Sequence, residues 1–477
     1  MDQDELHLET ELEKIRPLYQ KVSSQSVSQE VDERILNLAR NKTRRRGWSI
    51  FSIFRAPITR GQISTFATVA ALAVVSAWFV AELQPGGNRS GDVVMSKSLT
   101  AAIDKIDQEE LALFRDAVIK ALETEVAPHY EAWEESGIVP RELWNTLGNA
   151  GMLCVDVPEE WGGIGAPFQF SVVVGEELAR MGFGALSTNV MVHSDIVAPY
   201  LSHMGNEDQR QQWLPKLVSG EAVGAIAMTE PGAGSDLQAI RTSAVKDGDD
   251  YILNGSKTFI TNGQHADMVI VAAKTDPKAG ARGISLFLVD TSLPGFSKGR
   301  NLDKIGQHSG DTSELFFSDM RIPASALLGE EGQGFVYLMK ELPRERLVIG
   351  ALGVAAARGS LDLTIAYAQE RELFGQKLAQ LQNTRFEIAR METDYRVNKA
   401  FVDQCIDQYD LGELDAPTAS MAKYSATEMQ CRVADGCLQL FGGYGYTTEY
   451  PISRAFIDAR VQRIYGGTSE VMKEIIA

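Results

Sequence analysis

The closing stretch "RIYGGTSEVMKEIIA" (Arg463–Ala477) predicts a glycine loop that opens a helix. Gly466 and Gly467 allow the backbone to approach a ligand closely. Thr468 and Ser469 are both suitable helix N-cap residues, and Glu470 suits the first turn of a helix. Because the first turn of a helix leaves backbone N–H groups free, this loop suits a polar or anionic ligand. If chemistry takes place at this loop, Gly466 has no side chain to accept a proton, and the accepting group would come from elsewhere in the chain.

Length and composition limit the classes of protein to which this chain can belong. The chain has 477 residues, of which 44% are hydrophobic and 23% charged, so we expect a globular protein of about two to four domains. Its formal net charge of −18 argues against nucleic acid as a partner, which would require basic patches. The four cysteines form no CxxC pair, and the six histidines show no metal-ligand spacing. We therefore expect reduced thiols and no metal site.

The N-terminal part differs from the rest of the chain. Residues 1–61 are polar and charge-mixed, with basic residues clustered between 42 and 60. Residues 62–81 carry no charge, and about 20 such residues suffice for a transmembrane helix. Residues 82–97 contain "QPGGNRSGD" and predict a flexible linker. The positive-inside rule would keep the basic side cytoplasmic and carry everything after the span across the membrane.

From residue 98 onward the hydrophobic pattern indicates three further parts. Residues 98–221 show mainly helical spacing, including a predicted helix at 140–153. Residues 222–333 contain strand patterns, including "YILNGSKTFIT" (Tyr251–Thr261), which predicts a hairpin with Asn254–Gly255 as its turn. Residues 334–477 return to helical spacing. A long apolar stripe there predicts the core of a helix bundle and comprises Ala422, Ala426, Met429, Val433, Cys437 and Leu440.

A glycine-rich loop, "MTEPGAGSD" (Met228–Asp236), lies at the start of the strand-rich part. A dinucleotide-binding fingerprint would need a third glycine at position 237, which is leucine, so that interpretation fails. The glycines still expose backbone N–H groups, and Ser235 adds a hydroxyl. The loop can therefore hold a phosphate, although an ordinary turn has the same composition.

Four further motifs follow in order along the chain. They are "FITNG" (Phe259–Gly263), "ERELFGQKLAQLQ" (Glu370–Gln382), "LQLFGGYGY" (Leu438–Tyr446) and the closing stretch. Together with the glycine-rich loop, they make residues 99–477 resemble the acyl-CoA dehydrogenase family. The resemblance implies an N-terminal helical domain, a middle β-barrel and a C-terminal four-helix bundle. It also implies FAD, an acyl-CoA substrate oxidised at Cα–Cβ to the trans-2-enoyl-CoA, electron-transfer flavoprotein as acceptor, and a homotetramer or homodimer.

The resemblance also implies site residues. Those expected to bind FAD are Met228, Thr229, Ser235, Phe259, Ile260, Thr261, Arg371, Phe374, Gln382, Gln439, Gly442, Gly443, Thr468 and Glu470. Arg371, Phe374, Gln382, Gln439 and Gly443 are expected to reach the FAD of a neighbouring subunit. Phe259 stands where several members of the family have tryptophan. Those expected to contact the substrate are Ser235, Arg346, Tyr465 and Gly467.

The reaction needs a base for the weakly acidic α C–H and a donor for the thioester oxygen. Many members of the family have the base glutamate where this chain has Gly466, which leaves only its backbone N–H. The long-chain and isovaleryl types place the glutamate on the first long C-terminal helix, and "MKELPRERLVIG" (Met339–Gly350) resembles the long-chain type. The match makes Glu345 the base and Glu341 its rival. Pro343 predicts a bend that aims Glu345, and Gly466→Glu is expected to restore part of the rate when Glu345 is removed.

Three functions compete at this stage. The first is dehydrogenation of long or branched acyl-CoA thioesters in fatty acid β-oxidation. The second is an acyl-CoA oxidase that uses oxygen, and the third is a membrane-anchored sensor of acyl-CoA. A translocated dehydrogenase would meet neither substrate nor acceptor, so the expected location is the cytoplasm, with anchoring to the inner membrane through residues 62–81.

Overall fold

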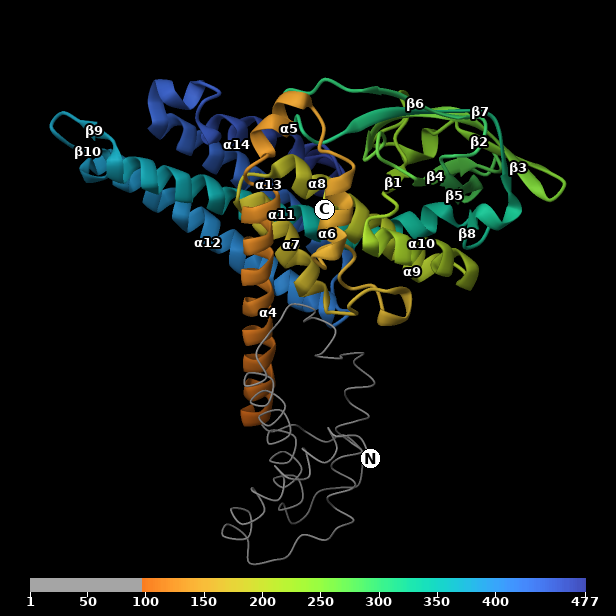
Figure 1. Ribbon diagram of the computed structural model, residues 1–477, viewed down its shortest axis with the longest axis horizontal. Helices are drawn as coiled ribbons and strands as arrows, with labels where there is room; N and C mark the ends of the chain where they lie inside the picture. The colour runs from red at the N-terminus through yellow and green to blue at the C-terminus, as the bar shows by residue number, and fades with distance from the viewer. Residues whose placement is uncertain (1–96) are drawn as a thin grey trace, which may run out of the picture. The chain divides into compact units, whose positions relative to one another are not determined.

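The computed structural model describes the backbone from Lys97 to Ala477, and the side chains from residue 108 (Figure 1). The polar N-terminal segment (1–61), the predicted membrane span (62–81) and the predicted linker (82–97) lie outside these residues, except for Lys97. Within the described residues, one helix, Gly334–Glu370, is long and apolar enough to cross a membrane. Because 72% of its most apolar stretch of 18 residues is buried in the protein, we interpret this helix as a core helix. Residues 110–477 form one compact unit.

The first part of this unit is helical. Its core element is α7 (Phe168–Arg180), which is buried along most of its length. Helix α10 begins with a reciprocal capping box between Asn206 and Gln209. The elements are α4 (Lys97–Glu125), α5 (Tyr130–Ser136), α6 (Glu142–Asn149), η1 (Glu159–Trp161), α7, α8 (Gly184–Met191), the π-helical turn η2 (Val192–Val197), α9 (Ala198–Met204) and α10 (Glu207–Ser219).

Helix α6 is shorter than the predicted helix at 140–153. Gly151 takes a φ of +69°, a left-handed conformation that a helix does not continue through. The preceding Gly148 also lies against the end of α10, where a Cβ would come within 2.4 Å of the Ser219 carbonyl. The close contact between two helix ends, which periodicity does not reveal, therefore sets the boundary of α6.

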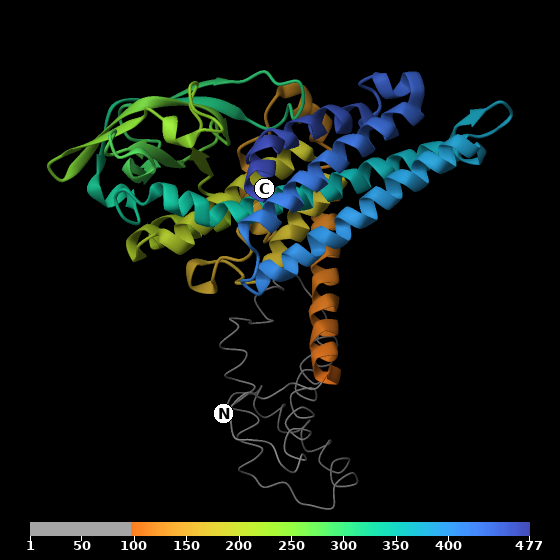
Figure 2. The same cartoon turned by 180° about the vertical axis from the view of Figure 1, so that it is seen from behind.

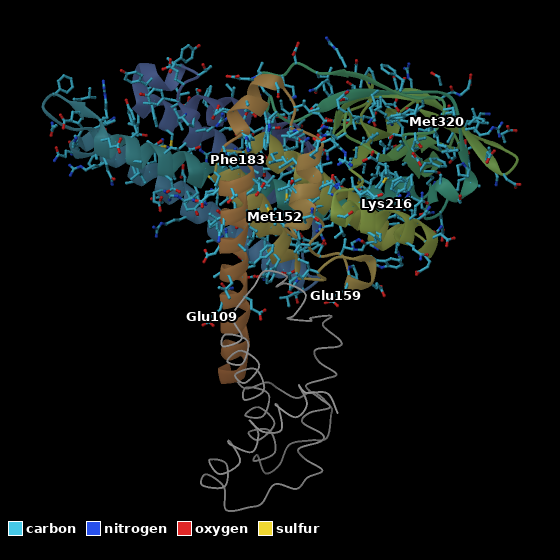
Figure 3. The ribbon with its side chains drawn as sticks, in the orientation of Figure 1. Glu109, Met152, Glu159, Phe183, Lys216 and Met320 are labelled. Atoms are coloured by element: carbon cyan, nitrogen blue, oxygen red, sulfur yellow. The ribbon has the colours of Figure 1, made fainter. Side chains whose placement is uncertain are left out.

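The strand-rich part forms one mixed sheet around an apolar core that includes Tyr251, Phe287 and Met320. Figure 3 labels Met320 among these strands. The strand order is β6-β7-β3-β2-β4-β5-β8, and β1 pairs with β4 in parallel. Strands β2 and β4 meet at a single pair, Ser243 and Lys274. The hydrogen-bonded ladder ends at β6 and β8, so closure into a barrel stays a prediction. The strands are β1 (Gly224–Ala227), β2 (Ser243–Asp247), β3 (Asp250–Thr261), β4 (Met268–Lys274), β5 (Ile284–Asp290), β6 (Phe296–Asn301), β7 (Thr312–Pro323) and β8 (Leu327–Leu328).

The predicted hairpin turn at Asn254–Gly255 is wrong. Strand β3 runs through these residues, and the register against β7 shifts there in a bulge. Gly255 is needed because its φ is +151° and a Cβ would lie 2.4 Å from Thr242 Oγ1. The turn lies instead at Gly248–Asp249, between Asp247 and Asp250, which pair across β2 and β3. Asn-Gly and Gly-Asp both permit positive φ, and only the strand pairing tells a turn from a bulge.

The last part consists of long helices, which Figures 1 and 2 show extending away from the sheet. Helices α11, α12 and α13 pack together, and the shorter α14 and α15 pack against α13. The predicted stripe on α13 is buried as expected, except for the half-buried Leu440. The elements are α11 (Gly334–Glu370), β9 (Glu372–Leu373), β10 (Gln376–Lys377), η6 (Leu378–Gln380), α12 (Gln382–Asp410), α13 (Ala416–Phe441), η7 (Gly442–Tyr446), α14 (Pro451–Ala459), η8 (Arg460–Arg463) and α15 (Ser469–Ile476).

Candidate active site

Glu345 lies on α11 with only 3% of its surface exposed. Tyr200, on α9, is fully buried and donates a hydrogen bond of 2.9 Å from its hydroxyl to Glu345 Oε1. Burial raises the pKa of Glu345 to about 7, and the repulsion of Glu341 adds to this effect. The Tyr200 hydrogen bond and the charge of Arg346 act in the opposite direction. A carboxyl group with a pKa near neutrality suits a general base.

The two arginines beside Glu345 have other partners in the described part of the chain. Arg344 pairs with Asp156 at 2.6 Å and with Asp195 at 2.7 Å, and its side chain is buried. Arg346 Nη1 donates to Ser420 Oγ at 3.4 Å, while its buried Nε has no hydrogen-bond partner among the described residues. Glu345 is therefore not a surface residue neutralised by a neighbouring arginine. The free Nε of Arg346 is consistent with its predicted contact to the substrate.

Glu341, the rival base, lies one turn before Glu345 on α11 and is also buried. Its Oε1 lies 2.9 Å from His203 Nδ1, on α9. The two carboxylates are thus distinguished by their partners: a tyrosine hydroxyl for Glu345 and an imidazole for Glu341. Helix α11 continues through Pro343, which lies between them, so the predicted bend stays a prediction.

The closing glycine loop lies against α11 close to Glu345. A Cβ on Gly466 would come within 2.3 Å of Ile349 Cδ1, and Ile349 follows Glu345 by one helical turn. Residues four apart on a helix face have Cβ atoms about 5–6 Å apart. The structure therefore brings together a carboxylate on α11 and the backbone N–H group of Gly466.

The same contact bears on the expectation that Gly466→Glu restores part of the rate when Glu345 is removed. Gly466 has a φ of +63°, which L side chains rarely adopt, and Ile349 fills the space beside it. A glutamate at this position needs both a strained backbone and a displaced isoleucine. The contacting atom is the far end of the Ile349 side chain, so a smaller residue at position 349 should increase the rescue.

Buried Lys423 supports the loop from α13. Its Nζ donates a hydrogen bond of 2.5 Å to the carbonyl oxygen of Gly467. Burial lowers the pKa of Lys423 to about 8, and the charge of Arg346 lowers it further. Thr468 caps α15 by accepting a hydrogen bond from the backbone N–H of Val471, as predicted for an N-cap, and Glu470 is exposed in the first turn. Tyr465 is partly buried, and its hydroxyl faces Thr188 and Gln307.

A second group of predicted residues gathers on the sheet. The backbone N–H of Thr258 donates to the carbonyl oxygen of Thr229, so the Met228–Thr229 loop lies beside the end of β3. Phe259, also on β3, is 67% exposed and has a φ of +58°, which is strained for a residue other than glycine. Ser235 is exposed and Thr261 is partly exposed. Ile260 is buried in the core of the sheet, so only its backbone could meet a ligand there.

The residue pair that holds this loop was not predicted. Lys257 is fully buried and donates to the Met228 carbonyl oxygen at 3.0 Å and to Glu230 Oε1 at 2.9 Å. Burial lowers the pKa of Lys257 to about 8, and Glu230 opposes that shift. An alternating strand pattern treats a lysine as solvent-facing, so periodicity could not find it. Tyr200, His203 and Lys423 were missed for a similar reason, because their roles depend on contacts between distant segments.

A third group lies at the far end of the long helices, away from the sheet in both views (Figures 1 and 2). The guanidinium of Arg371 lies 5.5 Å from the ring of Tyr444, and Tyr367 stacks on Phe441 with ring centroids 4.1 Å apart. The predicted members of this group are Arg371, Phe374, Gln382, Gln439, Gly442 and Gly443. Phe374 is 92% exposed at the tip of the β9–β10 hairpin. Within one chain, this group does not meet the residues on the sheet.

The group on the sheet fits FAD in its chemistry. Exposed Phe259 offers a flat apolar surface beside the Met228–Thr229 backbone. A Cβ on Gly232 or Gly234 would find no atom within 4 Å, so their backbone is open to a ligand. The group at the far end offers a guanidinium, exposed amides and the equally open Gly442 and Gly443. Such groups suit a diphosphate and a purine.

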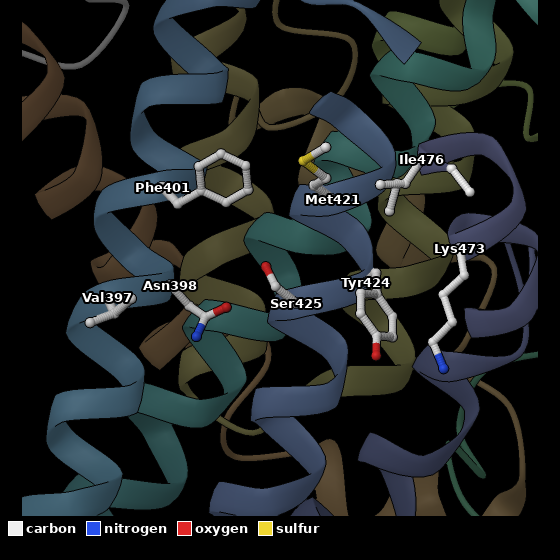
Figure 4. Close-up of a pocket in the computed structure, with 9 residues that line it drawn as sticks. Val397, Asn398, Phe401, Met421, Tyr424, Ser425, Lys473 and Ile476 are labelled. Carbon is white, nitrogen blue, oxygen red and sulfur yellow. The ribbon is translucent and has the colours of Figure 1, made fainter. Parts of the chain in front are cut away.

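A separate pocket of about 520 Å³ lies between α12, α13 and α15 (Figure 4). Its walls are mostly apolar and include Val397, Phe401, Met421 and Ile476, with Lys473 at the rim. None of the predicted site residues lines it. The described residues contain no group of three or more His, Cys, Asp or Glu side chains that could hold a metal ion. All four cysteines are free thiols, as predicted.

Models of the acyl-CoA dehydrogenase N-terminal, middle and C-terminal domains match residues 108–221, 225–320 and 332–477. The chain belongs to the acyl-CoA dehydrogenase family. The function expected from the sequence, acyl-CoA dehydrogenation in fatty acid oxidation, is confirmed at this level.

Particular relatives are similar over most of their length. The mitochondrial long-chain specific acyl-CoA dehydrogenase of Sus scrofa is 49% identical over 395 residues, covering 82% of this chain and 91% of that protein. The mitochondrial isovaleryl-CoA dehydrogenase of Pongo abelii is 40% identical, covering 79% and 89%. An acyl-CoA dehydrogenase structure from Geobacillus kaustophilus superimposes with a TM-score of 0.76 at 50% identity, covering 77% and 97%. A glutaryl-CoA dehydrogenase from Mycobacterium smegmatis, solved with FADH2, has a TM-score of 0.73 at 32% identity, covering 77% and 93%.

Proposed function

We propose that this protein oxidises long or branched acyl-CoA thioesters at Cα–Cβ, with FAD as cofactor and Glu345 as the base that takes the α-proton. The observation that carries the proposal is the position of Glu345, buried on α11 one turn from the residue that touches Gly466. The names of the long-chain and isovaleryl-CoA relatives support the substrate class. A bound FAD supplies the acceptor for the β-hydride.

Residues of this chain take up the proton and position the thioester. Glu345 accepts the proton while Tyr200 holds its carboxylate. The backbone N–H of Gly466 binds the thioester oxygen, and Lys423 holds the adjoining carbonyl oxygen so that the loop keeps its shape. Arg346 and Ser235 contact the CoA thioester. Burial of Glu345 excludes water, which strengthens its interaction with the acidified α C–H.

The cofactor site is shared between two copies of the chain in this proposal. Met228, Thr229, Phe259 and Thr261 hold the flavin part, together with the backbone of Ile260 and with Ser235, Thr468 and Glu470. Arg371, Phe374, Gln382, Gln439 and Gly443 contact the FAD of a neighbouring subunit, and Gly442 shapes their turn. The separation of the two groups within one chain supports a homodimer or homotetramer. Electron-transfer flavoprotein is the proposed acceptor, and hydrogen peroxide formed in step with turnover would favour an oxidase instead.

We expect kcat/KM to be higher for long or branched acyl-CoA thioesters than for short straight ones. The physical basis is the position of the base on α11 and not on the closing loop, which changes the space around Cα. A series of acyl-CoA thioesters assayed with purified protein and an artificial electron acceptor tests this expectation. A maximum at butyryl-CoA would refute the substrate class but not the reaction.

The reaction should show an acid limb near neutral pH. Glu345 acts as a base only when ionised, and burial raises its pKa to about 7. Below this pH, kcat/KM for flavin reduction should therefore fall about tenfold per pH unit, and above it the value should level off. Anaerobic stopped-flow measurements across the neutral range test this. A limb at the pKa of a solvated glutamate would show that the working base is not this buried carboxyl.

Residues before Met95 should be dispensable for catalysis. The family models begin matching at residue 108, and the first described helix begins at Lys97. We propose domain boundaries at 98–221, 222–333 and 334–477, with residues 1–97 as an anchor or fusion on a cytoplasmic enzyme. A protein comprising Met95–Ala477 should keep the flavin content and turnover of the full chain. An apoprotein or an inactive product would contradict this expectation.

A further inference from the structure

A buried ion pair adjoins the exposed residues on the sheet that we assign to FAD. The side chain of Lys257, on β3, has no exposed surface, and that of Glu230 is 7% exposed. Lys257 Nζ lies 2.9 Å from Glu230 Oε1 and also donates to the carbonyl oxygen of Met228 at 3.0 Å. Apolar residues of similar volume are often as stable in such a position as a buried ion pair. Stability alone therefore does not account for this pair.

Glu230 anchors the glycine-rich loop at its inner end. The Glu230 carboxylate also accepts hydrogen bonds from the backbone N–H groups of Arg241, at 2.6 Å, and Thr242, at 3.0 Å. The backbone of Glu230 pairs with that of Ala233 in both directions, at 2.9 and 3.1 Å, which closes the tight turn between them. The side chain of Glu230 is thus fixed by three donors, and its backbone holds the turn.

Lys257 anchors the same loop from β3. It is the last residue in regular register with β7 before a bulge, and the pairing resumes at Ile260. The bulge contains Thr258 and Phe259, and Phe259 has the strained φ of +58° and the exposed ring. The backbone N–H of Thr258 donates to the Thr229 carbonyl oxygen at 3.0 Å. One lysine therefore links the start of the bulge to the loop beside it.

The outer surfaces that this pair connects are open. The bulge presents the ring of Phe259, and the loop presents Gly234 and Ser235, both of which are exposed. A Cβ on Gly234 would find no described atom within 4 Å, so the outer half of the loop is held through its inner end. Backbone groups that are already held in their bound arrangement lose less entropy when a ligand arrives.

We propose that Lys257 and Glu230 are positioning residues for FAD, which hold the glycine-rich loop and the bulge at Phe259 in the arrangement that the cofactor requires. The proposal rests on the proposed FAD site and adds to it two residues that do not contact the cofactor. The pair takes no part in proton or hydride transfer. Its effect is on the affinity for FAD and on the surroundings of the bound flavin ring.

The experiment measures FAD binding and folding stability separately. The purified holoenzyme is stripped of flavin, FAD is titrated back, and the quenching of FAD fluorescence gives the dissociation constant. Urea unfolding of the apoprotein gives its stability. The variants are Lys257→Met and the double variant Lys257→Met/Glu230→Gln, in which no buried charge of the pair is left without its partner.

Lys274→Met is the matched control. Lys274 is a buried lysine of the same sheet, on β4. Its Nζ donates to the carbonyl oxygen of Gly280, between β4 and β5, and not to the glycine-rich loop. This substitution should leave the dissociation constant for FAD close to that of the unmodified protein.

In Lys257→Met, the dissociation constant for FAD should rise by about 10- to 100-fold, as for groups that orient the ligands of a metal ion without touching it. The visible absorption bands of the bound flavin should move toward those of free FAD. The urea midpoint should fall, because Glu230 is left buried without its cation. In the double variant the urea midpoint should recover while FAD affinity stays low, because the Met228 carbonyl oxygen still lacks its donor.

Three outcomes overturn the proposal: unchanged FAD affinity in Lys257→Met, recovery of FAD affinity together with the urea midpoint in the double variant, or an equal loss of affinity in Lys274→Met. The second would mean that the pair only stabilises the fold. If Lys257→Met does not fold, the comparison of the double variant with the unmodified protein decides. An unmodified apoprotein that does not bind FAD would instead overturn the proposed cofactor.

Discussion

Glu345→Gln should lower the rate of flavin reduction by acyl-CoA by about 10²–10⁴-fold, the contribution of a general base. Glutamine keeps the shape of the side chain and can still accept the Tyr200 hydrogen bond through its amide oxygen. It cannot take up the α-proton. Binding of FAD and acyl-CoA should remain close to normal, because no contact other than the proton acceptor is removed. Anaerobic bleaching of the flavin measures this step directly.

Glu341→Gln is the matched comparison, since it changes a carboxylate of the same helix, one turn away and equally buried. Its flavin reduction should change little. The reverse pattern, with a large loss in Glu341→Gln and near-normal bleaching in Glu345→Gln, would exchange the roles of the two residues.

The closing glycine loop allows a gain-of-function version of the same experiment. In the Glu345→Gln background, Gly466→Glu by itself should restore little of the bleaching, because the new Cβ must displace the end of the Ile349 side chain. Adding Ile349→Ala removes the clash and should restore part of the rate, although the positive φ at this position still opposes a side chain. Rescue by Gly466→Glu without the second change would show that Ile349 moves aside freely.

Arg344→Met should destabilise the catalytic part by about 3–5 kcal/mol, because removing one partner of a buried ion pair leaves an uncompensated charge. Arg344 is the cation bonded to Asp195, whose surface is 1% exposed, and to Asp156. Methionine fills a similar volume and packs on Phe168, over which the guanidinium now lies at 4.6 Å. The loss is measured as a lower urea midpoint of unfolding. Arg321→Met, at an exposed pair of salt bridges, should leave the urea midpoint nearly unchanged, because solvent screens exposed ion pairs.

The pH dependence identifies the cause of this destabilisation. Burial raises the pKa of Asp195 even with Arg344 in place, and the loss of the arginine removes the largest opposing influence. A carboxyl whose folded pKa exceeds its unfolded value opposes folding only where it would be ionised, so the penalty grows as the pH rises and fades toward acid. The difference between Arg344→Met and the unmodified protein should therefore shrink at low pH. A difference independent of pH would indicate lost packing instead.

The sequence by itself determined the order of the helical, strand-rich and helical parts. Hydrophobic spacing is a local property, and a period near 3.6 or 2 records which faces must be buried. The stripe on α13 and the buried strands β4 and β5 follow directly from it. Local chemistry also indicated a helix start at Thr468 or Ser469, and the structure shows that the hydroxyl of Thr468 caps the helix. The succession of glycine-containing motifs indicated the family before any contact between them was known.

Only the tertiary structure decided which of these residues act together. The Asn254–Gly255 step lies in a bulge and not in a turn because β7 pairs along the whole of β3. Glu345 is distinguished from Glu341 by partners on α9, more than a hundred residues away, and by Ile349, which ties the closing loop to the same helix. Lys257 and Lys423 can be buried because backbone carbonyl oxygens from distant loops accept hydrogen bonds from their ammonium groups. Burial, hydrogen bonding and the pKa of a carboxyl depend on what surrounds a side chain in space, and local sequence does not record that environment.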